Sequence, residues 1–304
     1  MLELSPRLPA GYQSRPATAA DVSAIQGLVA DCELQSRAET DRDAIAAVLA
    51  RPGLDPASDT LLVHDAAGEL IAWAWVNRRS EIDVHPGHRG RQVGSSLLAW
   101  VEARARQTGS QRIVQTVPDN DRAATALLRS HGYEPMVTAW LLEIVMPTEP
   151  EVPDPPAGIM VRSFQPGDEA AVYQLTEDAF DEWQERRKSY QEWARLTVER
   201  ATFAPALSSV AFERDQLVGA VLSLDVPDAD EGYVERVAVR RDHRNRGIAR
   251  VLLRQAFRDF YQQGRRTCTL WTHSDTGALS LYERVGMTTR HSSTVYRKAL
   301  DTPH

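Results

Sequence analysis

The clearest periodic pattern of apolar residues in the chain begins after Gly247. Apolar side chains recur there every three or four positions, as they do on one face of an α-helix: Ala249, Leu252, Leu253, Ala256, Phe257 and Phe260. An apolar run, Val237, Ala238 and Val239, precedes this segment, and Gly264 follows it. The run is typical of a buried strand, and glycine is suited to end a helix. The pattern therefore predicts a strand, a short loop and then a long helix.

The loop between this strand and this helix is basic. It contains Arg244, Asn245 and Arg246, followed by Gly247, Ile248 and Ala249. The small residues would let a ligand approach the first helical turn, whose unpaired N–H groups and positive dipole end favour an anion. Arginine side chains add charge for phosphate oxygens. The loop is a candidate phosphate site, and the alternative is a basic connection without a ligand.

An altered copy of this loop lies earlier in the chain. His88 and Arg89 stand 155 positions before His243 and Arg244, and Gly94 takes the place of Ala249. The start of each half also repeats, because Pro9-Ala10-Gly11 and Pro156-Ala157-Gly158 are 147 positions apart. Such self-similarity along the chain indicates a duplicated unit.

The repeat predicts the same order of elements twice. Each half opens with a strand, a turn and a helix, with Asp21 and Asp168 as early helix caps. Alternating apolar segments around Ala67-Gly68 and around Asp215 predict a β-hairpin in each half. We expect a mixed α/β fold of two tandem domains, each with a twisted, mostly antiparallel sheet, a splayed central strand pair and flanking helices.

Chain length and proline content predict the domain boundaries. A chain of 304 residues is long enough for two domains. The acidic, proline-rich segment 149–156 has no apolar period and is typical of an extended linker. We therefore expect an N-terminal domain over residues 1–148 and a C-terminal domain over residues 157–304.

Composition narrows the class of partner. The net charge of −7 argues against a nucleic-acid-binding surface. No apolar run is long enough to cross a membrane, and the first residues lack the apolar core of a signal peptide, so we expect a cytoplasmic protein. The cysteines, Cys32 and Cys268, are too few for a disulfide framework. His85 and His88 are separated by proline and glycine, which precludes a helical metal-binding face, and we expect no metal site.

Two motifs in the second half resemble those of the GCN5-related N-acetyltransferase (GNAT) superfamily. The first is Arg244-x-x-Gly247-x-Ala249, and the second is Asp275-x-x-Ala278-x-x-Leu281-Tyr282-x-x-x-Gly286. The tandem layout, with Phe180 and Trp183 in an acidic aromatic segment, is similar to that of acetyltransferases related to mycothiol synthase.

The resemblance implies acetyl-CoA as cosubstrate and an amine as acceptor. Backbone N–H groups around Arg246, Gly247, Ile248 and Ala249 would hold the pyrophosphate, and exposed backbone at Val237 and Val239 would pair with the pantetheine arm. The full set of residues that the resemblance assigns to cofactor binding is Val237, Ala238, Val239, Arg244, Asn245, Arg246, Gly247, Ile248, Ala249, Asp275, Ala278 and Leu281.

Transfer of an acyl group from a thioester to an amine needs a base for the amine and an acid for the thiolate. Tyr282 stands at the family's usual position for that acid, and its alternative role is a partly buried aromatic that joins helix to sheet. Glu235 shares strand parity with Val237 and Val239, so it is a candidate base. Other bases remain open, namely Glu231, Asp225 and His273, and Glu235 would then orient the substrate or pair with an arginine.

The first half lacks the residues that this chemistry needs. Compared with the second half, Gln92 stands at the position of Gly247, Ser80 at the position of Glu235 and Leu128 at the position of Tyr282. We expect the first domain to be a catalytically degenerate scaffold, with a looser CoA site as the alternative.

These observations predict acetyl transfer from acetyl-CoA to a primary amine of a small molecule, by direct attack on the thioester in the C-terminal domain. Phe180 and Trp183 are weak candidates for the acceptor pocket, and the alternative is that they pack a helix onto its sheet. Two other functions stay open: a non-catalytic protein that binds or senses acyl-CoA, and a protein N-acetyltransferase. We expect a monomer or a homodimer with no nucleic-acid or membrane partner.

Overall fold

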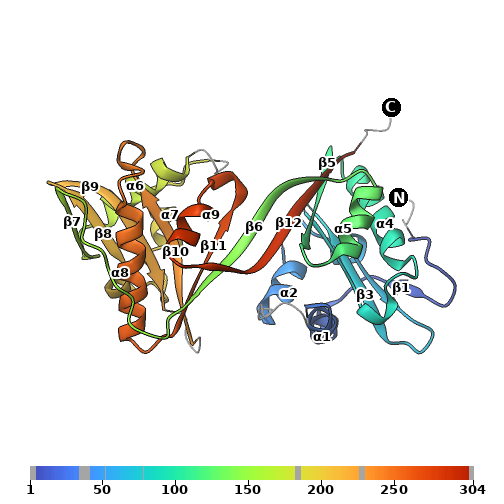
Figure 1. Cartoon of the computed structure of the whole chain (residues 1–304). Helices are drawn as coiled ribbons and strands as arrows, with labels where there is room; N and C mark the ends of the chain where they lie inside the picture. Colours follow the sequence, from blue (N-terminus) through green and yellow to red (C-terminus); the bar gives the residue numbers. More distant parts are fainter. Residues whose placement is uncertain are drawn as a thin grey trace. The chain divides into compact units, whose positions relative to one another are not determined.

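The computed structural model describes residues 5–33, 42–51, 53–77, 79–181, 186–225 and 230–300. The chain forms two compact units (Figure 1). The first unit contains Met1–Val137 and Ser293–His304, and the second contains Thr138–Ser292.

The first unit is a six-stranded sheet within the described residues, in the order β1-β2-β3-β4-β5-β12. Its strands are β1 (Gln13–Arg15), β2 (Thr60–His64), β3 (Leu70–Val76), β4 (Ser80–Val84), β5 (Arg112–Pro118) and β12 (Thr288–Ala299), the last from Ser293 onward. Its helices are α1 (Val22–Glu33), α2 (Arg42–Leu49), α3 (Pro56–Asp59), α4 (Val93–Gln107) and α5 (Arg122–Ser130).

The second unit repeats this arrangement in the order β6-β11-β10-β9-β8-β7. Its strands are β6 (Glu134–Val145), from Thr138 onward, β7 (Ile159–Ser163), β8 (Ser209–Glu213), β9 (Gln216–Leu224), β10 (Glu231–Val239) and β11 (Thr267–His273). Its helices are α6 (Glu169–Phe180), α7 (Tyr190–Leu196), α8 (Ile248–Gln262) and α9 (Leu279–Arg284). The pairing is antiparallel except between β10 and β11, as it is in the first unit except between β4 and β5. The predicted mixed α/β fold and both hairpins are confirmed.

The last strand of each sheet comes from the other half of the sequence. Residues 139–145 of β6 pair with β11 in the second unit, and residues 293–299 of β12 pair with β5 in the first. The unit boundaries therefore depart from the predicted ones at 148 and 157. Segment 149–156, predicted as the linker between domains, joins β6 to β7 inside the second unit, where Glu149 accepts a hydrogen bond from Gln262 (2.7 Å). Apolar alternation predicts a strand but does not say which strand it pairs with.

Each unit has an equivalent ion pair, which joins its first strand to the residue just before its first α-helix. Arg15 binds Asp21 at 2.6 Å, and Arg162 binds Asp168 at 2.7 Å. The predicted capping role is only partly right, because the two carboxylates accept from the backbone N–H groups of Thr18 and Gln165, upstream of the helix. Each aspartate therefore fixes the turn that leads into its helix.

Helices cover both faces of each sheet. In the second unit α8 packs on one face, through Leu252, Ala256 and Phe257, while α6 and α7 pack on the other, through Val172 and Trp193. Gly264, with φ of 90°, ends α8 as predicted. Cys268 is fully buried in β11, which raises the pKa of its thiol. This packing holds β10 between the two helical layers, with β11 packed on α8.

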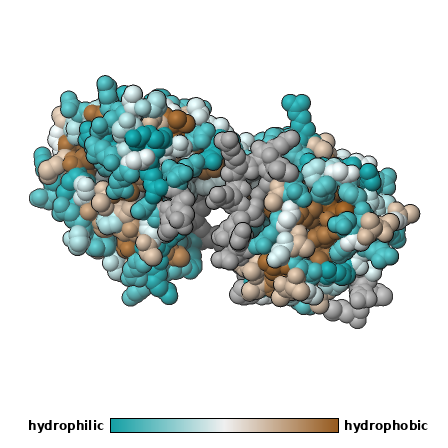
Figure 2. Space-filling model, turned by 90° about the horizontal axis from the view of Figure 1, so that it is seen from below, coloured by the Kyte–Doolittle hydropathy of each residue, from teal (hydrophilic) through white to brown (hydrophobic). Residues whose placement is uncertain are grey.

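The visible face of each unit is mainly hydrophilic, with smaller apolar patches (Figure 2). Among the described residues, no helix is long and apolar enough to cross a membrane.

Candidate active site

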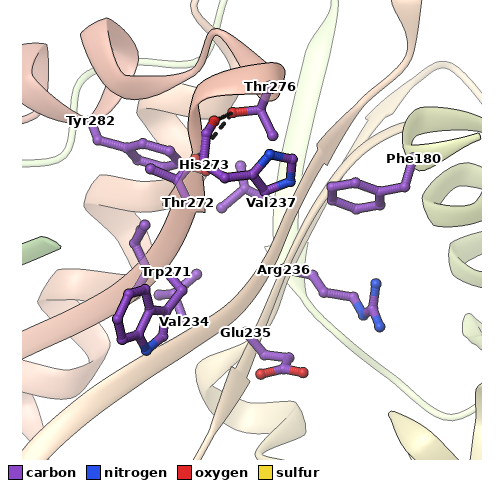
Figure 3. A pocket seen from close by; sticks show the side chains of 11 residues that line it. Phe180, Val234, Glu235, Arg236, Val237, Trp271, Thr272, His273, Thr276 and Tyr282 are labelled. Atoms are coloured by element: carbon purple, nitrogen blue, oxygen red, sulfur yellow. Dashed lines mark hydrogen bonds between the residues drawn. The ribbon is translucent and has the colours of Figure 1, made fainter. Parts of the chain in front are cut away.

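The central strands of the second unit separate along their length. Strands β10 and β11 pair in parallel at Glu231–Tyr233 and Thr267–Thr269, next to the start of both strands. Further along, a β-bulge between Val234 and Arg236 interrupts the register of β10 with β9. Bulges bend a strand and redirect its side chains. The result is a cleft between β10 and β11 (Figure 3).

Side chains from four elements line this cleft. Strand β10 contributes residues 234–237, strand β11 residues 270–273, helix α6 Phe180 and helix α9 Tyr282, with Thr276 from the turn before α9. The cleft thus brings together the predicted acid, the predicted base, Val237 and Phe180 (Figure 3). Trp183, the other acceptor candidate, lies outside the described residues.

Tyr282 is buried at the end of the cleft, with 7 % of its surface exposed. Its backbone is fixed by hydrogen bonds from the Tyr282 N–H to the Ala278 carbonyl (3.3 Å) and from the Met287 N–H to the Tyr282 carbonyl (3.0 Å). Burial raises the pKa of the phenol to about 12, because the phenolate would lose its hydration. The side chain is therefore a neutral proton donor at physiological pH.

Glu235 lies at the bulge, so the strand-parity argument that predicted its position does not hold. The alternation that gave Glu235 the same face as Val237 and Val239 does not continue across a bulge, where one extra residue is inserted. The carboxylate still lines the cleft, and it forms an ion pair with Arg200 at 3.5 Å. The pattern of apolar residues carried no signal for the bulge.

The alternative candidate bases differ in their hydrogen-bond partners and in whether they line the cleft. Glu231 accepts two hydrogen bonds from Arg290 (2.7 and 2.8 Å), and Asp225 pairs with Arg265 at 3.0 Å, so both carboxylates are held away from the cleft lining. His273 does line the cleft, and its buried Nδ1 has no hydrogen-bond partner within the described part of the chain. Of the four candidate bases, Glu235 and His273 line the cleft.

The predicted phosphate loop has the geometry of an anion site. Asn245 and Gly247 adopt left-handed backbone conformations, with φ of 63° and 85°, immediately before α8. The first regular helical hydrogen bond of α8 here is that of the Val251 N–H to the Gly247 carbonyl (3.2 Å), so the N–H groups of the preceding turn have no intrahelical acceptor. A Cβ at Gly247 would find no atom within 4 Å, so open space lies above this turn. These features fit the pyrophosphate of CoA.

Charged groups brace the same loop. Arg246 forms an ion pair with Glu213 at 2.8 Å, and His243 contacts both Asp242 (2.7 Å) and Glu213 (3.1 Å). These carboxylates raise the pKa of His243, the Asp242 contact most strongly. Arg244 donates from Nε to the Val239 carbonyl (3.4 Å), which joins the loop to the end of β10.

The remaining predicted cofactor residues lie around the loop and the cleft. Val237 and Val239 pack against the core beneath α8, whereas the Ala238 side chain faces the opposite core, with α6 and α7. Ala278 and Leu281 are partly buried beside Tyr282. Asp275 is exposed in the turn that precedes α9.

The corresponding region of the first unit has the same backbone but different chemistry. Gln92 adopts the left-handed conformation of Gly247, with φ of 65°, and Gly90 that of Asn245, with φ of 74°. Ser80 donates to the Val114 carbonyl (3.0 Å) and accepts from Gln115 (2.9 Å), which bridges the strands where the second unit has its cleft. Leu128, 4 % exposed, accepts the same backbone hydrogen bond as Tyr282. At these two positions the first unit therefore has neither a tyrosine nor a carboxylate.

A model of the acetyltransferase (GNAT) family matches both halves of the chain, over residues 25–133 and 170–287. The chain belongs to the GNAT family. It is an N-acetyltransferase that uses acetyl-CoA as its cosubstrate. Each matched range contains its own copy of the loop described above, in agreement with the repeat seen in the sequence.

Solved structures with this tandem arrangement are similar along nearly the whole chain. A GCN5-related N-acetyltransferase from Sphaerobacter thermophilus is 31 % identical, covers 96 % of this chain and 97 % of its own, and gives a TM-score of 0.77. A tandem GNAT protein from the clavulanic acid biosynthesis pathway shares the fold, with a TM-score of 0.66 at 16 % identity over 96 % of this chain and 100 % of its own.

Curated relatives include proteins named mycothiol acetyltransferase. The one from Saccharopolyspora erythraea is 28 % identical over 76 % of this chain and 82 % of its own length. The one from Thermobispora bispora is also 28 % identical, over 78 % of this chain and 83 % of its own length. The predicted likeness to mycothiol-related tandem GNAT proteins is confirmed.

Proposed function

We propose that this GNAT protein acetylates a primary amine of a small molecule, and that the chemistry takes place in the second unit. The observation that carries the proposal is that one cleft contains Tyr282 and Glu235 and lies beside an intact phosphate loop. The first unit has a similar loop but lacks both side chains. We assign it the role of a non-catalytic scaffold.

The reaction follows from the order of groups along β10. The loop at Gly247 binds the pyrophosphate, and the backbone of residues 237–239 aligns the pantetheine arm, so that the thioester enters the cleft. The amine attacks the thioester carbonyl carbon, which forms the C–N bond. When the C–S bond breaks, Tyr282 donates its proton to the departing thiolate. The amine loses its proton to Glu235, directly or through a water molecule.

Glu235 is the first candidate for the base, because its carboxylate lines the cleft and is held there by an ion pair with Arg200 at 3.5 Å. His273 is the second candidate, because it lines the same cleft and its buried Nδ1 has no hydrogen-bond partner in the described residues. The variants Glu235→Gln and His273→Gln distinguish the two candidates. The variant whose pH–rate profile loses its ascending limb identifies the base.

The names of the curated relatives support a small-molecule acceptor. The test is thiol release from acetyl-CoA against a panel of small amines, with the acetylated product identified by mass spectrometry. We expect product from at least one amine and a stoichiometric yield of free CoA. CoA binding without product from any small amine, combined with acetylation of a peptide amine, would instead favour a protein acceptor.

A further inference from the structure

Arg236 is a charged side chain of the cleft that the reaction above does not use. It follows the bulge on β10 and extends beside Phe180, with its guanidinium carbon 5.8 Å from the ring centroid (Figure 3). Its Nε is buried and has no hydrogen-bond partner within the described residues. A cation–π contact does not provide a hydrogen-bond acceptor, so the Nε–H stays unsatisfied.

The ion pairs nearby do not include Arg236. Glu235, the one carboxylate among the described residues of the cleft lining, pairs with Arg200. Glu231 forms an ion pair with Arg290, and Asp225 forms one with Arg265. No ion pair of the described part of the chain contains the Arg236 guanidinium. A half-buried arginine with an unsatisfied donor is costly unless a ligand provides the acceptor.

The charge balance of this corner indicates what kind of ligand fits. Among the arginines and carboxylates that line the cleft or pair with a lining residue, Arg200 and Arg236 are positive and Glu235 is negative, so this set has one excess positive charge. A single excess cation matches a monoanion. The planar fork of arginine binds the two oxygens of a carboxylate in parallel.

The first unit provides an internal comparison. Glu81 stands 155 positions before Arg236, in the equivalent place on β4, and it accepts a hydrogen bond from the Trp75 indole at 2.9 Å. There the position carries the opposite charge and already has a partner. The unpaired cation occurs in the unit that also has Tyr282 and Glu235.

We propose that Arg236 binds a carboxylate of the acceptor, so that the substrate is an amine that also bears a carboxylate group. This inference rests on the proposed function of the cleft and adds a substrate class to it. Arg236 acts as a specificity residue: it holds the anionic end of the acceptor while the amine faces the thioester. Its contribution appears in the binding of the acceptor rather than in the proton transfers.

Matched acceptors test this assignment. We would measure thiol release from acetyl-CoA with L-amino acids and their carboxamides, and with phosphoethanolamine and ethanolamine, for the wild-type protein and for Arg236→Gln, Arg236→Lys and the control Arg258→Gln on α8. We expect wild-type kcat/KM to favour carboxylates over matched amides by at least about tenfold. Arg236→Gln should lower kcat/KM for carboxylates by about 10- to 100-fold, mainly through KM, and leave the amides unchanged.

The conservative variant and the control sharpen the result. Arg236→Lys keeps the charge but not the fork, so it should recover part of the preference, and Arg258→Gln should behave like the wild type. Equal losses for carboxylates and amides in Arg236→Gln would show a merely structural role and overturn the proposal. A preference for phosphoethanolamine over every carboxylate would overturn the choice of carboxylate.

Calorimetry separates this inference from the proposed function. N-acetyl amino acids, which resemble the products, are titrated into the CoA-bound wild-type protein and into Arg236→Gln. Binding that disappears in the variant supports carboxylate binding by Arg236 even if no amine is acetylated, and in that case the proposed function fails while the carboxylate site stands. Turnover of neutral amines without any preference, or the absence of carboxylate binding, overturns the inference and leaves acetyl transfer intact.

Discussion

Replacement of Tyr282 by phenylalanine removes one hydroxyl from the cleft and changes little else. The side chain is 7 % exposed, and none of the hydrogen bonds within the described residues uses its phenol. The pKa of about 12 lies about two units above that of an ordinary tyrosine, which favours the neutral phenol by about 3 kcal/mol. Tyr282 therefore stays protonated over the whole pH range of the assay. We expect its action as a general acid not to change with pH in that range.

We expect Tyr282→Phe to lower kcat by about 100- to 1000-fold, because a positioned general acid contributes rate enhancements of about this size. The KM for acetyl-CoA should stay within about twofold, since the phosphate loop is unchanged. The assay is thiol release from about pH 6 to about pH 10, and Tyr296→Phe, a buried tyrosine of the first unit, is the matched control. Full activity of Tyr282→Phe would refute the acid assignment. A wild-type descending limb near pH 8 that the variant removes would refute the neutral-donor argument.

Three further substitutions test the packing and electrostatics of the two units. Gly232→Ala should destabilise the protein by about 1–3 kcal/mol in urea unfolding, because the new Cβ would lie 2.5 Å from a ring carbon of Phe260. Lys298→Met should cost about 2 kcal/mol in the same measurement, because it removes an ion pair of 2.8 Å from the buried carboxylate of Glu102 and so loosens β12 on the first unit. His243→Gln should lower stability more at about pH 6 than at about pH 8.5: the folded-state pKa of His243 is raised, so its stabilisation is complete below the unfolded pKa of about 6.5 and is lost as pH rises through the folded value.

These three predictions have internal controls. Gly27→Ala on α1 meets no atom within 4 Å and should be neutral or stabilising by about 0.5–1 kcal/mol, whereas equal stability of Gly232→Ala and wild type would contradict the packing described. Lys298→Arg should retain most of the stability of the ion pair, and no loss in Lys298→Met would show that β12 is held by other contacts. A stability difference for His243→Gln that does not change with pH would show that folding does not raise the pKa of His243, which would contradict the effect of the two carboxylates.

The sequence was most informative where local pattern determines structure. The 3.6-residue period after Gly247 predicted α8, the apolar run before it predicted the end of β10, and the repeat offset identified Ser80, Gln92 and Leu128 as the counterparts of the second unit's residues. Each of these features depends on neighbours in the chain, so a single sequence is enough to show it.

Features that depend on distant partners could not be predicted. The exchange of β6 and β12 between the units is a choice of strand partner, and apolar alternation is the same for either choice. The bulge at Glu235 breaks the parity argument without a residue that marks it. The sequence alone also did not show that Gln92 adopts the left-handed conformation of the glycine at the equivalent position, because glutamine rarely takes this conformation.

The central claim is that acetyl transfer takes place in the second unit, and reciprocal exchange at the two loops tests it most directly. A Cβ at Gly247 has open space around it, and Gln92 shows that glutamine adopts this conformation, so Gly247→Gln should fold and interfere only with the bound ligand. In steady-state thiol-release kinetics we expect Gly247→Gln to raise the KM for acetyl-CoA by at least about tenfold, and Gln92→Gly to leave kcat and KM unchanged. Wild-type kinetics for Gly247→Gln, together with altered kinetics for Gln92→Gly, would contradict the account and assign the chemistry to the first unit.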